Sequence, residues 1–361
     1  MSYLNTLLVI GISIYGLNSI TRMNYISILT LGNIMETLNT TTQIDTVGIQ
    51  VDCINTYEQH ERLVALVNFI VATPSLYYRY KDTLIGCGMK YRTYYIYCNG
   101  KILATISTGS FQTLVNRHLI TQYYIRILFA GLKSYNDIYD KGSYEGLMRL
   151  CAFLNGTKQE RRRGGRIPFK IKELDCCIDV HCSFNNVWAT CVKRAGRTNY
   201  YNANDSQAYL TTYYIEKIAS NKLSNAVQRA YLYDKQHKED LSEPISRFEV
   251  KLQSNYFINH GFNINSIKKA LNRYYFMYFD DLNIKAKKMA EYHRLEVLEQ
   301  QKKIKPKEHR KTLVRSREIN KLKLDPYRLY FDTEYIESFI DNMYLITLDD
   351  LEWKFDVKVI K

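Results

Sequence analysis

The sequence predicts an α+β fold, with a sheet-rich body followed by a basic helical C-terminal region. Several runs alternate aromatic or branched residues with polar ones at period two, which is typical of half-buried strands. Apolar patterns of helical period lie between these runs in the first half of the chain. The 361 residues are 46% hydrophobic and 24% charged, so the chain can bury a large core over two or three domains.

The chain is strongly basic, with 50 Lys and Arg against 36 Asp and Glu and a net charge of +14. This balance predicts a polyanionic partner, either nucleic acid or an acidic membrane surface. The alternative is a host whose proteome is rich in Lys, Asn, Ile and Tyr. None of the eight cysteines forms a CxxC pair, which favours reduced core thiols in a cytoplasmic protein over a zinc ribbon or a disulfide framework.

Residues 1–42 are interpreted as an apolar N-terminal extension and linker. Residues 1–21 carry no charged side chain, and the first basic residue, Arg22, follows the apolar run instead of preceding it as in a signal peptide. Polar residues interrupt the run more often than a spanning helix allows. A peripheral element, or a start at Met23 or Met35, is therefore expected in preference to a membrane anchor.

One domain is expected over residues 43–260, in two α+β halves with a connector near 156–168. Its first half should contain a strand at 43–52, a helix at 58–71 and a hairpin turning at Asn99-Gly100. Residues 114–155 are expected to be largely helical. The connector carries a basic cluster suited to phosphate contact, although a solvated linker explains it equally well. The cluster comprises Arg161, Arg162, Arg163 and Arg166.

The second half is predicted to carry a polar sheet face. A strand at 177–182 has Asp179 and His181 on one face, and Pro244 separates two later strands at 229–235 and 247–253. Such a face is costly to bury unless its charges are paired, which favours a groove. The residues expected on it are Arg229, Tyr231, Tyr233 and Lys235 from one strand, and Arg247, Glu249 and Lys251 from the next.

These residue types could support phosphodiester chemistry. A tyrosine can attack phosphorus and keep the bond energy as a phosphotyrosine, provided that a cation stabilises the phenolate. Lys235 shares a face with Tyr233 and could supply that charge. Carboxylates bind hard divalent ions, so Glu249 and Asp179 are candidate ligands. His181 is a further candidate, with a half-buried structural histidine as the alternative.

Residues 261–361 form the predicted C-terminal region. Within it, residues 285–323 hold 14 Lys or Arg against five Glu, and Pro306 divides the stretch into two helices. The pair of basic helices could track DNA phosphates. A solvated charged helix that covers the sheet is the alternative.

The order of these segments resembles a known family. The runs TTYY at 211–214, RAYLYDK at 229–235 and RFEVK at 247–251 are similar to the order TLYxG, RxYxK and RxExxL in rolling-circle replication initiators. Plasmid replication-initiation factors and the gene II endonucleases of filamentous phage belong to this group. Residues 43–51 resemble the opening IDxLxxxxP strand of these proteins, and residues 174–180 resemble their Asp-bearing strand.

The resemblance implies a relaxase-like nicking domain of two related α+β halves. Its implied activity is the nicking and rejoining of one strand at a replication origin, with Mg²⁺ or Mn²⁺ and a tyrosine nucleophile. Tyr233 is the first candidate and Tyr214 the second, and Glu249 is the metal ligand carried over. Arg229, Arg247 and Lys251 would contact the DNA. A host helicase is an implied partner, and a homodimer is left open.

Two departures limit the resemblance. Ile215-Glu216 stands where the family has glycine, and the sequence has no His-hydrophobic-His metal motif, which restricts the resemblance to the carboxylate-metal class. The alternative function is that of a non-catalytic DNA-binding protein, such as a theta-type initiator or a repressor.

Overall fold

A computed structural model describes residues 38–72, 76–84, 90–98, 100–115, 118–132, 142–191, 200–201, 212–215, 228–279 and 327–354. The expectations for residues 1–37 and for the basic stretch 285–323 lie outside these ranges. The described chain is α+β, as predicted.

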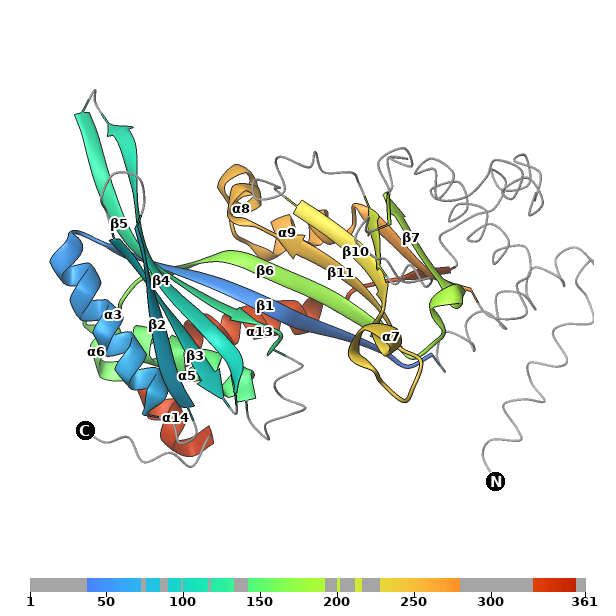
Figure 1. Ribbon diagram of the computed structural model, residues 1–361, viewed down its shortest axis with the longest axis horizontal. Coiled ribbons are helices and arrows are strands. Elements are labelled where there is room, and N and C mark those ends of the chain that lie inside the picture. The colour runs from blue at the N-terminus through green and yellow to red at the C-terminus, as the bar shows by residue number, and fades with distance from the viewer. Residues whose placement is uncertain are drawn as a thin grey trace, which may run out of the picture.

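The body is built on one ten-stranded antiparallel sheet, in the order β2-β3-β4-β5-β1-β6-β11-β10-β9-β8 (Figure 1). β1 and β6 pair at its centre, so they join a half made of β2–β5 to a half made of β8–β11. The strands are β1 (Thr40–Cys53), β2 (Leu76–Leu84), β3 (Lys90–Cys98), β4 (Lys101–Val115), β5 (His118–Ala130), β6 (Phe169–Val180), β8 (Tyr200–Tyr201), β9 (Thr212–Ile215), β10 (Gln228–Asp234) and β11 (Ser246–Leu252).

Helices α3 (Thr56–Val71) and α5 (Gly142–Asn155) cover one face of the first half (Figure 1). α3 begins at Asn55, whose side chain accepts a hydrogen bond from the Glu58 backbone N–H at 2.8 Å and so satisfies one free helix donor. Its apolar stripe, which includes Leu63 and Leu66, is buried with Ile106 and other sheet residues. The helix expected at 58–71 and the strand expected at 43–52 are thereby confirmed.

A second layer covers the same side of the other half. It consists of α8 (Ser254–His260), α9 (Ile264–Leu271), α13 (Thr333–Leu345), α14 (Leu348–Lys354) and a small sheet of β7 (Val187–Cys191), β12 (Tyr274–Tyr278) and β13 (Arg328–Leu329). Phe248 of β11 stacks on Phe276 of β12 with centroids 4.9 Å apart. The Asn155 amide donates hydrogen bonds to Met343 and Ile346 carbonyl oxygens at 3.0 and 2.8 Å. The described parts of residues 261–361 therefore belong to the core of the body and include strands.

The expectation of a largely helical segment at 114–155 is wrong for its first part. β4 runs to Val115 and β5 occupies His118–Ala130, while α5 begins only at Gly142. Burial in β5 alternates, with Ile125, Ile127 and Phe129 inaccessible and Arg126 exposed, which is the period of a strand. An apolar-rich segment of this length is ambiguous until its partner strand is known.

Three short helices complete the described structure: α6 (Lys158–Arg162), η2 (Phe184–Asn186) and α7 (Lys235–Glu239). The expected basic loop at 158–166 thus begins as a helix, whose N-terminus is capped by a capping box between Thr157 and Glu160. Likewise Lys235 does not continue β10 but opens α7, capped by Asp234. None of the helices described here is both long and apolar enough to cross a membrane.

The two halves meet closely at Gly48 in β1. Glu173 of β6 lies across this glycine and extends to Arg126 of β5, where its carboxylate accepts a hydrogen bond from Nη2 at 2.7 Å. A Cβ on residue 48 would stand 2.7 Å from the Cβ of Glu173, closer than atoms pack. The absence of a side chain at Gly48 is therefore what lets Glu173 bridge the halves.

Replacing Gly48 with Ala should destabilise the protein by about 1–3 kcal/mol, because the added methyl group overpacks the β1–β6 seam. Urea unfolding measures this change. Gly146→Ala in α5 is the matched control, since its new Cβ would meet Leu103 and Phe129 at ordinary contact distances of 3.5 Å. A Gly48→Ala variant as stable as the control would contradict this account of the seam.

Candidate functional site

The structure assembles the predicted polar face on β6, β10 and β11. Antiparallel register aligns its residues in rows across the three strands, and directly opposed residues of a sheet point to the same face. The rows are Tyr233–Arg247–Asp179, Tyr231–Glu249–Cys177 and Arg229–Lys251–Asp175. The period-two expectation for these strands is confirmed, whereas the other face carries apolar residues such as Phe248 and Leu232.

Arg247 and Asp179 form a buried, two-pronged ion pair at the centre of this face. Arg247 Nε lies 2.5 Å from Asp179 Oδ1 and Nη2 lies 2.9 Å from Oδ2, and both side chains are 1% exposed. Arg247 Nη1 also donates to Asp45 Oδ1 at 3.0 Å, and Lys235 Nζ lies 3.2 Å from Asp179 Oδ2. Parallel N–H···O bonds fix the orientation of both side chains.

Asp45 is a site residue that the sequence analysis did not identify. It occupies a register shift between Ile44 and Thr46 in the pairing of β1 with β6. A bulge of this kind redirects a side chain, here toward Arg247. The signal available was an acidic residue within a strand of alternating polar and apolar residues, which by itself does not indicate where the carboxylate points.

A second ion network lies one row along the face. Lys251 Nζ is 2.6 Å from Asp175 Oδ2 and 3.6 Å from Glu173 Oε1, and Glu173 in turn holds Arg126. Lys251 was expected to contact DNA. Its ammonium contacts two carboxylates of β6, and DNA contact by Lys251 stays a prediction.

Glu249 lies between the two networks and is 8% exposed. Burial raises its pKa, and so does the negative charge of Asp45, although Lys251 and Arg247 oppose this. Burial likewise raises the pKa of Asp175 well above its usual range, despite the Lys251 ammonium beside it. Both carboxyls sit where a further positive charge would be stabilised.

Tyr233, the first candidate nucleophile, is 4% exposed. Burial raises its pKa above the ordinary value, and Arg247 only partly compensates. The cation on its ring is Lys238, whose Nζ is 4.0 Å from the centroid. Lys235, expected to steady the Tyr233 phenolate, lies against Asp179 and Glu239 at 3.2 and 3.7 Å.

Tyr214, the second candidate, lies on β9 opposite Tyr231 and is half-buried. The two rings meet edge to face, with centroids 5.4 Å apart. Because Tyr231 is itself opposite Glu249, a row of Tyr214, Tyr231 and Glu249 crosses three adjacent strands. The pKa of Tyr231 is raised by burial and by the Glu249 charge.

The three predicted metal ligands do not come together. Asp179 is held by Arg247 and Lys235, and His181 lies beyond the end of β6, with Nδ1 3.8 Å from Glu243 Oε2. Within the described ranges, no group of three His, Cys, Asp or Glu side chains could hold a metal ion. The negative charge of Asp45 raises the pKa of Glu249, an effect that a bound cation would relieve.

The predicted arginine cluster lies in the helical layer. Arg161 Nη1 donates to the Leu345 carbonyl oxygen at 3.0 Å, next to the contact of Lys158 with Asp350 in α14. Arg162, Arg163 and Arg166 are exposed beside it. Arg229 is half-buried on the polar face, opposite Lys251. DNA binding by these residues stays a prediction.

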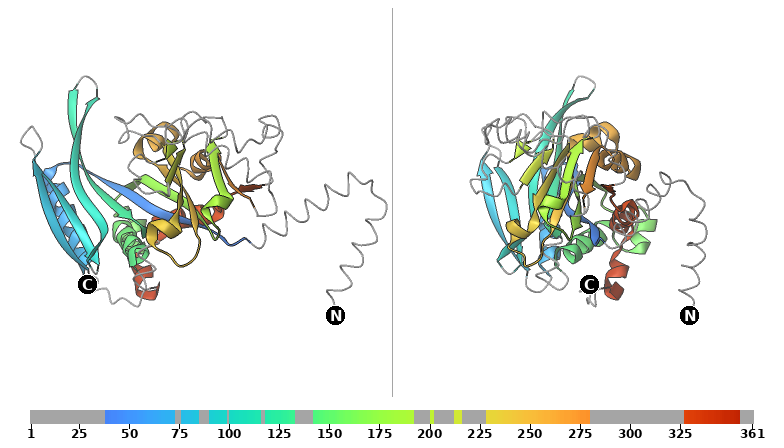
Figure 2. Two further views of the ribbon diagram at one scale, coloured as in Figure 1. Left: turned by 45° about the vertical axis from the view of Figure 1, so that its right-hand side comes forward. Right: turned by 90° about the vertical axis from the view of Figure 1, so that its right-hand side faces the viewer.

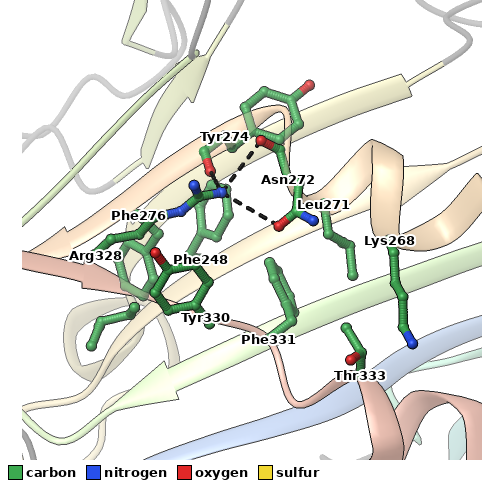
Figure 3. Close-up of a pocket in the computed structure, with 11 residues that line it drawn as sticks. Phe248, Lys268, Leu271, Asn272, Tyr274, Phe276, Arg328, Tyr330, Phe331 and Thr333 are labelled. Atoms are coloured by element: carbon green, nitrogen blue, oxygen red, sulfur yellow. Dashed lines mark hydrogen bonds between the residues drawn. The ribbon is translucent and has the colours of Figure 1, made fainter. Parts of the chain in front are cut away.

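A cavity of about 410 Å³ lies on the other side of β11, between Phe248, the β12–β13 sheet and α9 (Figure 3). Arg328 spans it and donates to the Tyr274 and Asn272 carbonyl oxygens at 3.0 and 3.3 Å. Because Phe248 and Glu249 alternate along β11, the strand separates this cavity from the polar face.

Comparison with known proteins leaves the family open. No protein-family model matches the sequence, and no curated protein matches it. A rolling-circle replication initiator from Geobacillus stearothermophilus aligns over 69% of this chain and 91% of its own, with 11% identity and a TM-score of 0.33. An acyl-CoA hydrolase from Agrobacterium tumefaciens aligns over 60% and 96%, with 12% identity and a TM-score of 0.09. Neither superposition is close enough to carry an argument, so function must be inferred from the residues themselves.

Replacing Asp179 with Ala should destabilise the protein by about 3–5 kcal/mol, because Arg247 and Lys235 would be left buried with uncompensated charge. The matched control is Asp82→Ala, which removes the exposed Arg92–Asp82 pair and should cost about 0–1 kcal/mol. Denaturant unfolding of both variants tests the difference. Equal losses would mean that the central pair does not organise the face.

Replacing Glu249 with Gln should change how stability depends on pH. The folded-state pKa of Glu249 lies above its ordinary value of 4.5, so the folded protein holds this proton more tightly than the unfolded chain. Stability contributed by the protonated carboxyl is therefore lost as pH rises from the unfolded pKa through the folded one. The Gln variant lacks this loss, so its stability relative to the wild type should increase as pH rises.

Urea unfolding between about pH 4 and pH 8, with EDTA present, measures this trend. Glu160→Gln is a control of opposite sign, because hydrogen bonds from Thr157 lower the pKa of Glu160. For this control, the stability of the wild type relative to Glu160→Gln should increase as pH rises. A Glu249→Gln trend that is flat or has the Glu160 sign would refute the assignment.

Proposed function

We propose that this protein is a rolling-circle replication initiator that nicks and rejoins one DNA strand at its origin through a phosphotyrosine. The observation that carries the proposal is the row of Tyr214, Tyr231 and Glu249 on the polar face of the sheet. The row joins, on adjacent strands, the three segments whose order resembles that family. A net charge of +14 suits a DNA substrate.

In the proposed reaction, a tyrosine oxygen attacks the phosphorus of the scissile phosphodiester. The bond from phosphorus to the leaving 3′-oxygen breaks, the phenol proton is lost, and a 5′-phosphotyrosine and a free 3′-hydroxyl remain. Attack of a 3′-hydroxyl on the phosphotyrosine reverses these steps and rejoins the strand. Bond count is conserved, so no external energy source is needed.

Exposure favours Tyr214 over Tyr233 as the attacking residue. A phosphodiester must reach the phenol oxygen, and Tyr233 is 4% exposed whereas Tyr214 is half-buried. In the row, only the side chain of Tyr231 lies between Tyr214 and Glu249. Tyr233 then serves the site by packing beside Arg247, its neighbour on β11.

Glu249 and Asp45 are the residues that would hold Mg²⁺ or Mn²⁺. A divalent ion bound there would supply positive charge to the scissile phosphate and to the departing oxygen. A bound cation would favour the ionised form of Glu249, whose pKa burial raises. Arg247 and Asp179 hold Asp45 and the floor of the site in place. Strand separation beyond the nick would require a helicase of the host.

The test is covalent capture of DNA. Purified protein is incubated with Mg²⁺ and a supercoiled plasmid carrying the coding sequence with its flanking DNA, and adducts are detected on denaturing gels. Wild type should nick and form an adduct, whose tyrosine is identified by peptide mapping. Tyr214→Phe should abolish the adduct, and Glu249→Ala should reduce nicking by about 10²-fold or more.

Tyr213→Phe is the matched control, because Tyr213 is adjacent to Tyr214 but faces the apolar layer and packs on Trp188 at 4.5 Å. It should nick like wild type. If Tyr214→Phe, Tyr231→Phe and Tyr233→Phe all retain the adduct, the proposed chemistry is wrong. Tight binding of this DNA with neither nick nor adduct would instead identify a non-catalytic DNA-binding protein.

A further inference from the structure

The polar face continues across the first half of the sheet, far from the candidate nicking site. Arg126 of β5 reaches Glu173 of β6, so both halves present the same face on this side. Register carries that face from Arg126 to Ser107, Thr93 and then Lys81 on β2. The described helices that pack on this half, α3 and α5, lie against its other face (Figure 2).

Tyrosines dominate this surface, which we call the tyrosine face: Tyr77, Arg79 and Lys81 of β2, Tyr95 and Tyr97 of β3, and Phe111 and Tyr124 of β4 and β5. Tyr77 and Tyr97 stack with centroids 5.3 Å apart and planes 9° from parallel. The Arg79 guanidinium lies 5.6 Å from the Tyr97 centroid. Tyr77 is 42% exposed, although tyrosine is a residue that a sheet can readily bury.

Further rings contact one another on this face. The Tyr124 ring lies over Gly109, where a Cβ would stand 2.3 Å from the ring, and it contacts Phe111 with centroids 5.9 Å apart and planes at 48°. Gly109 therefore leaves room for the Tyr124 ring above the strand. Exposed rings on a sheet are suited to stacking against nucleobases, each of which has a π face.

Charge on the tyrosine face has one sign in the described part of β2–β5. Arg79 and Lys81 lie on it, whereas Asp82 lies on the other face and is paired with Arg92. Next to this part of the face, Arg126 is held by Glu173, and Asp52 of β1, opposite Tyr124, is held by Lys170. Cations interleaved with rings match the alternation of phosphates and bases along a single strand. Duplex DNA keeps its bases stacked on one another and cannot use the rings.

We propose that the tyrosine face binds single-stranded DNA by base stacking and leads it toward the nicking site. The proposal deepens the proposed function, since the bound strand would be the one that is nicked. Stacking on these rings needs no particular base, so the face would bind without sequence preference. Recognition of the origin sequence would then reside elsewhere in the chain.

The probe is a fluorescein-labelled oligo(dT) of 30 nucleotides, whose binding to the full chain is followed by anisotropy at several salt concentrations. Tyr77→Ala with Tyr97→Ala should weaken binding by about tenfold or more, because two stacking platforms are lost. Arg79→Gln and Lys81→Gln should each lower the slope of log K against log salt by about 0.7.

The matched control is Tyr78→Ala, which removes a tyrosine of the same strand and equal exposure, 43%, on the opposite face. It should bind oligo(dT) like wild type. Equal losses in Tyr78→Ala and the double variant, no loss in either, or a duplex of the same length binding as tightly as oligo(dT) would each overturn the proposal.

Failure of the nicking chemistry is distinguishable from failure of this proposal. Tyr214→Phe should leave oligo(dT) affinity unchanged, whatever its effect on the covalent adduct. If no substitution at the candidate site affects nicking but the Tyr77→Ala, Tyr97→Ala double variant still binds oligo(dT) more weakly, the binding surface is supported and the proposed function is wrong. If the double variant keeps oligo(dT) binding while Tyr214→Phe loses its adduct, the reverse holds.

Discussion

The polar face depends on the two-pronged pair between Arg247 and Asp179. Guanidinium and carboxylate are both essentially inaccessible to water, a situation tolerated only when geometry satisfies both groups. The pair links β11 to β6, and its third prong holds Asp45 of β1. Three strands from distant parts of the chain are thereby held in one register, and Glu249 and the tyrosine row derive their positions from it.

The packing of other elements on one face of the large sheet determines where polar residues can gather. Helices and the small β7–β12–β13 sheet supply an apolar layer to one face, so residues at alternate positions along each strand are buried there. At the remaining positions, the ion networks of the second half are buried, whereas the first half exposes rings beside the basic residues Arg79 and Lys81. A single architectural fact thus creates both a candidate reaction centre and a surface leading to it.

The charged residues of the site fall into two groups, those engaged in ion pairs with one another and Glu249. Asp179, Lys235 and Lys251 have the residue types of catalytic groups, yet their charged ends are committed to one another or to neighbouring carboxylates. Glu249 differs, because burial and Asp45 raise its pKa while the nearby cations do not cancel the effect. The Glu249 carboxyl, beside half-buried tyrosines, is therefore the group of this face proposed to bind a cation.

The sequence by itself determined the α+β class, the strands of the polar face and their facing, because period-two alternation and turn residues are local properties. Through the order of segments it also indicated Tyr233, Tyr214 and Glu249 as candidate site residues. Tertiary structure decided that 118–130 is a strand, since only its pairing with β1 and β4 resolves an ambiguous apolar run. It also decided the partners of each charge: Asp45 enters through a bulge, Lys235 contacts Asp179, and His181 lies near Glu243 beyond the end of β6. Such contacts join residues up to 202 positions apart, a distance over which no local pattern carries information.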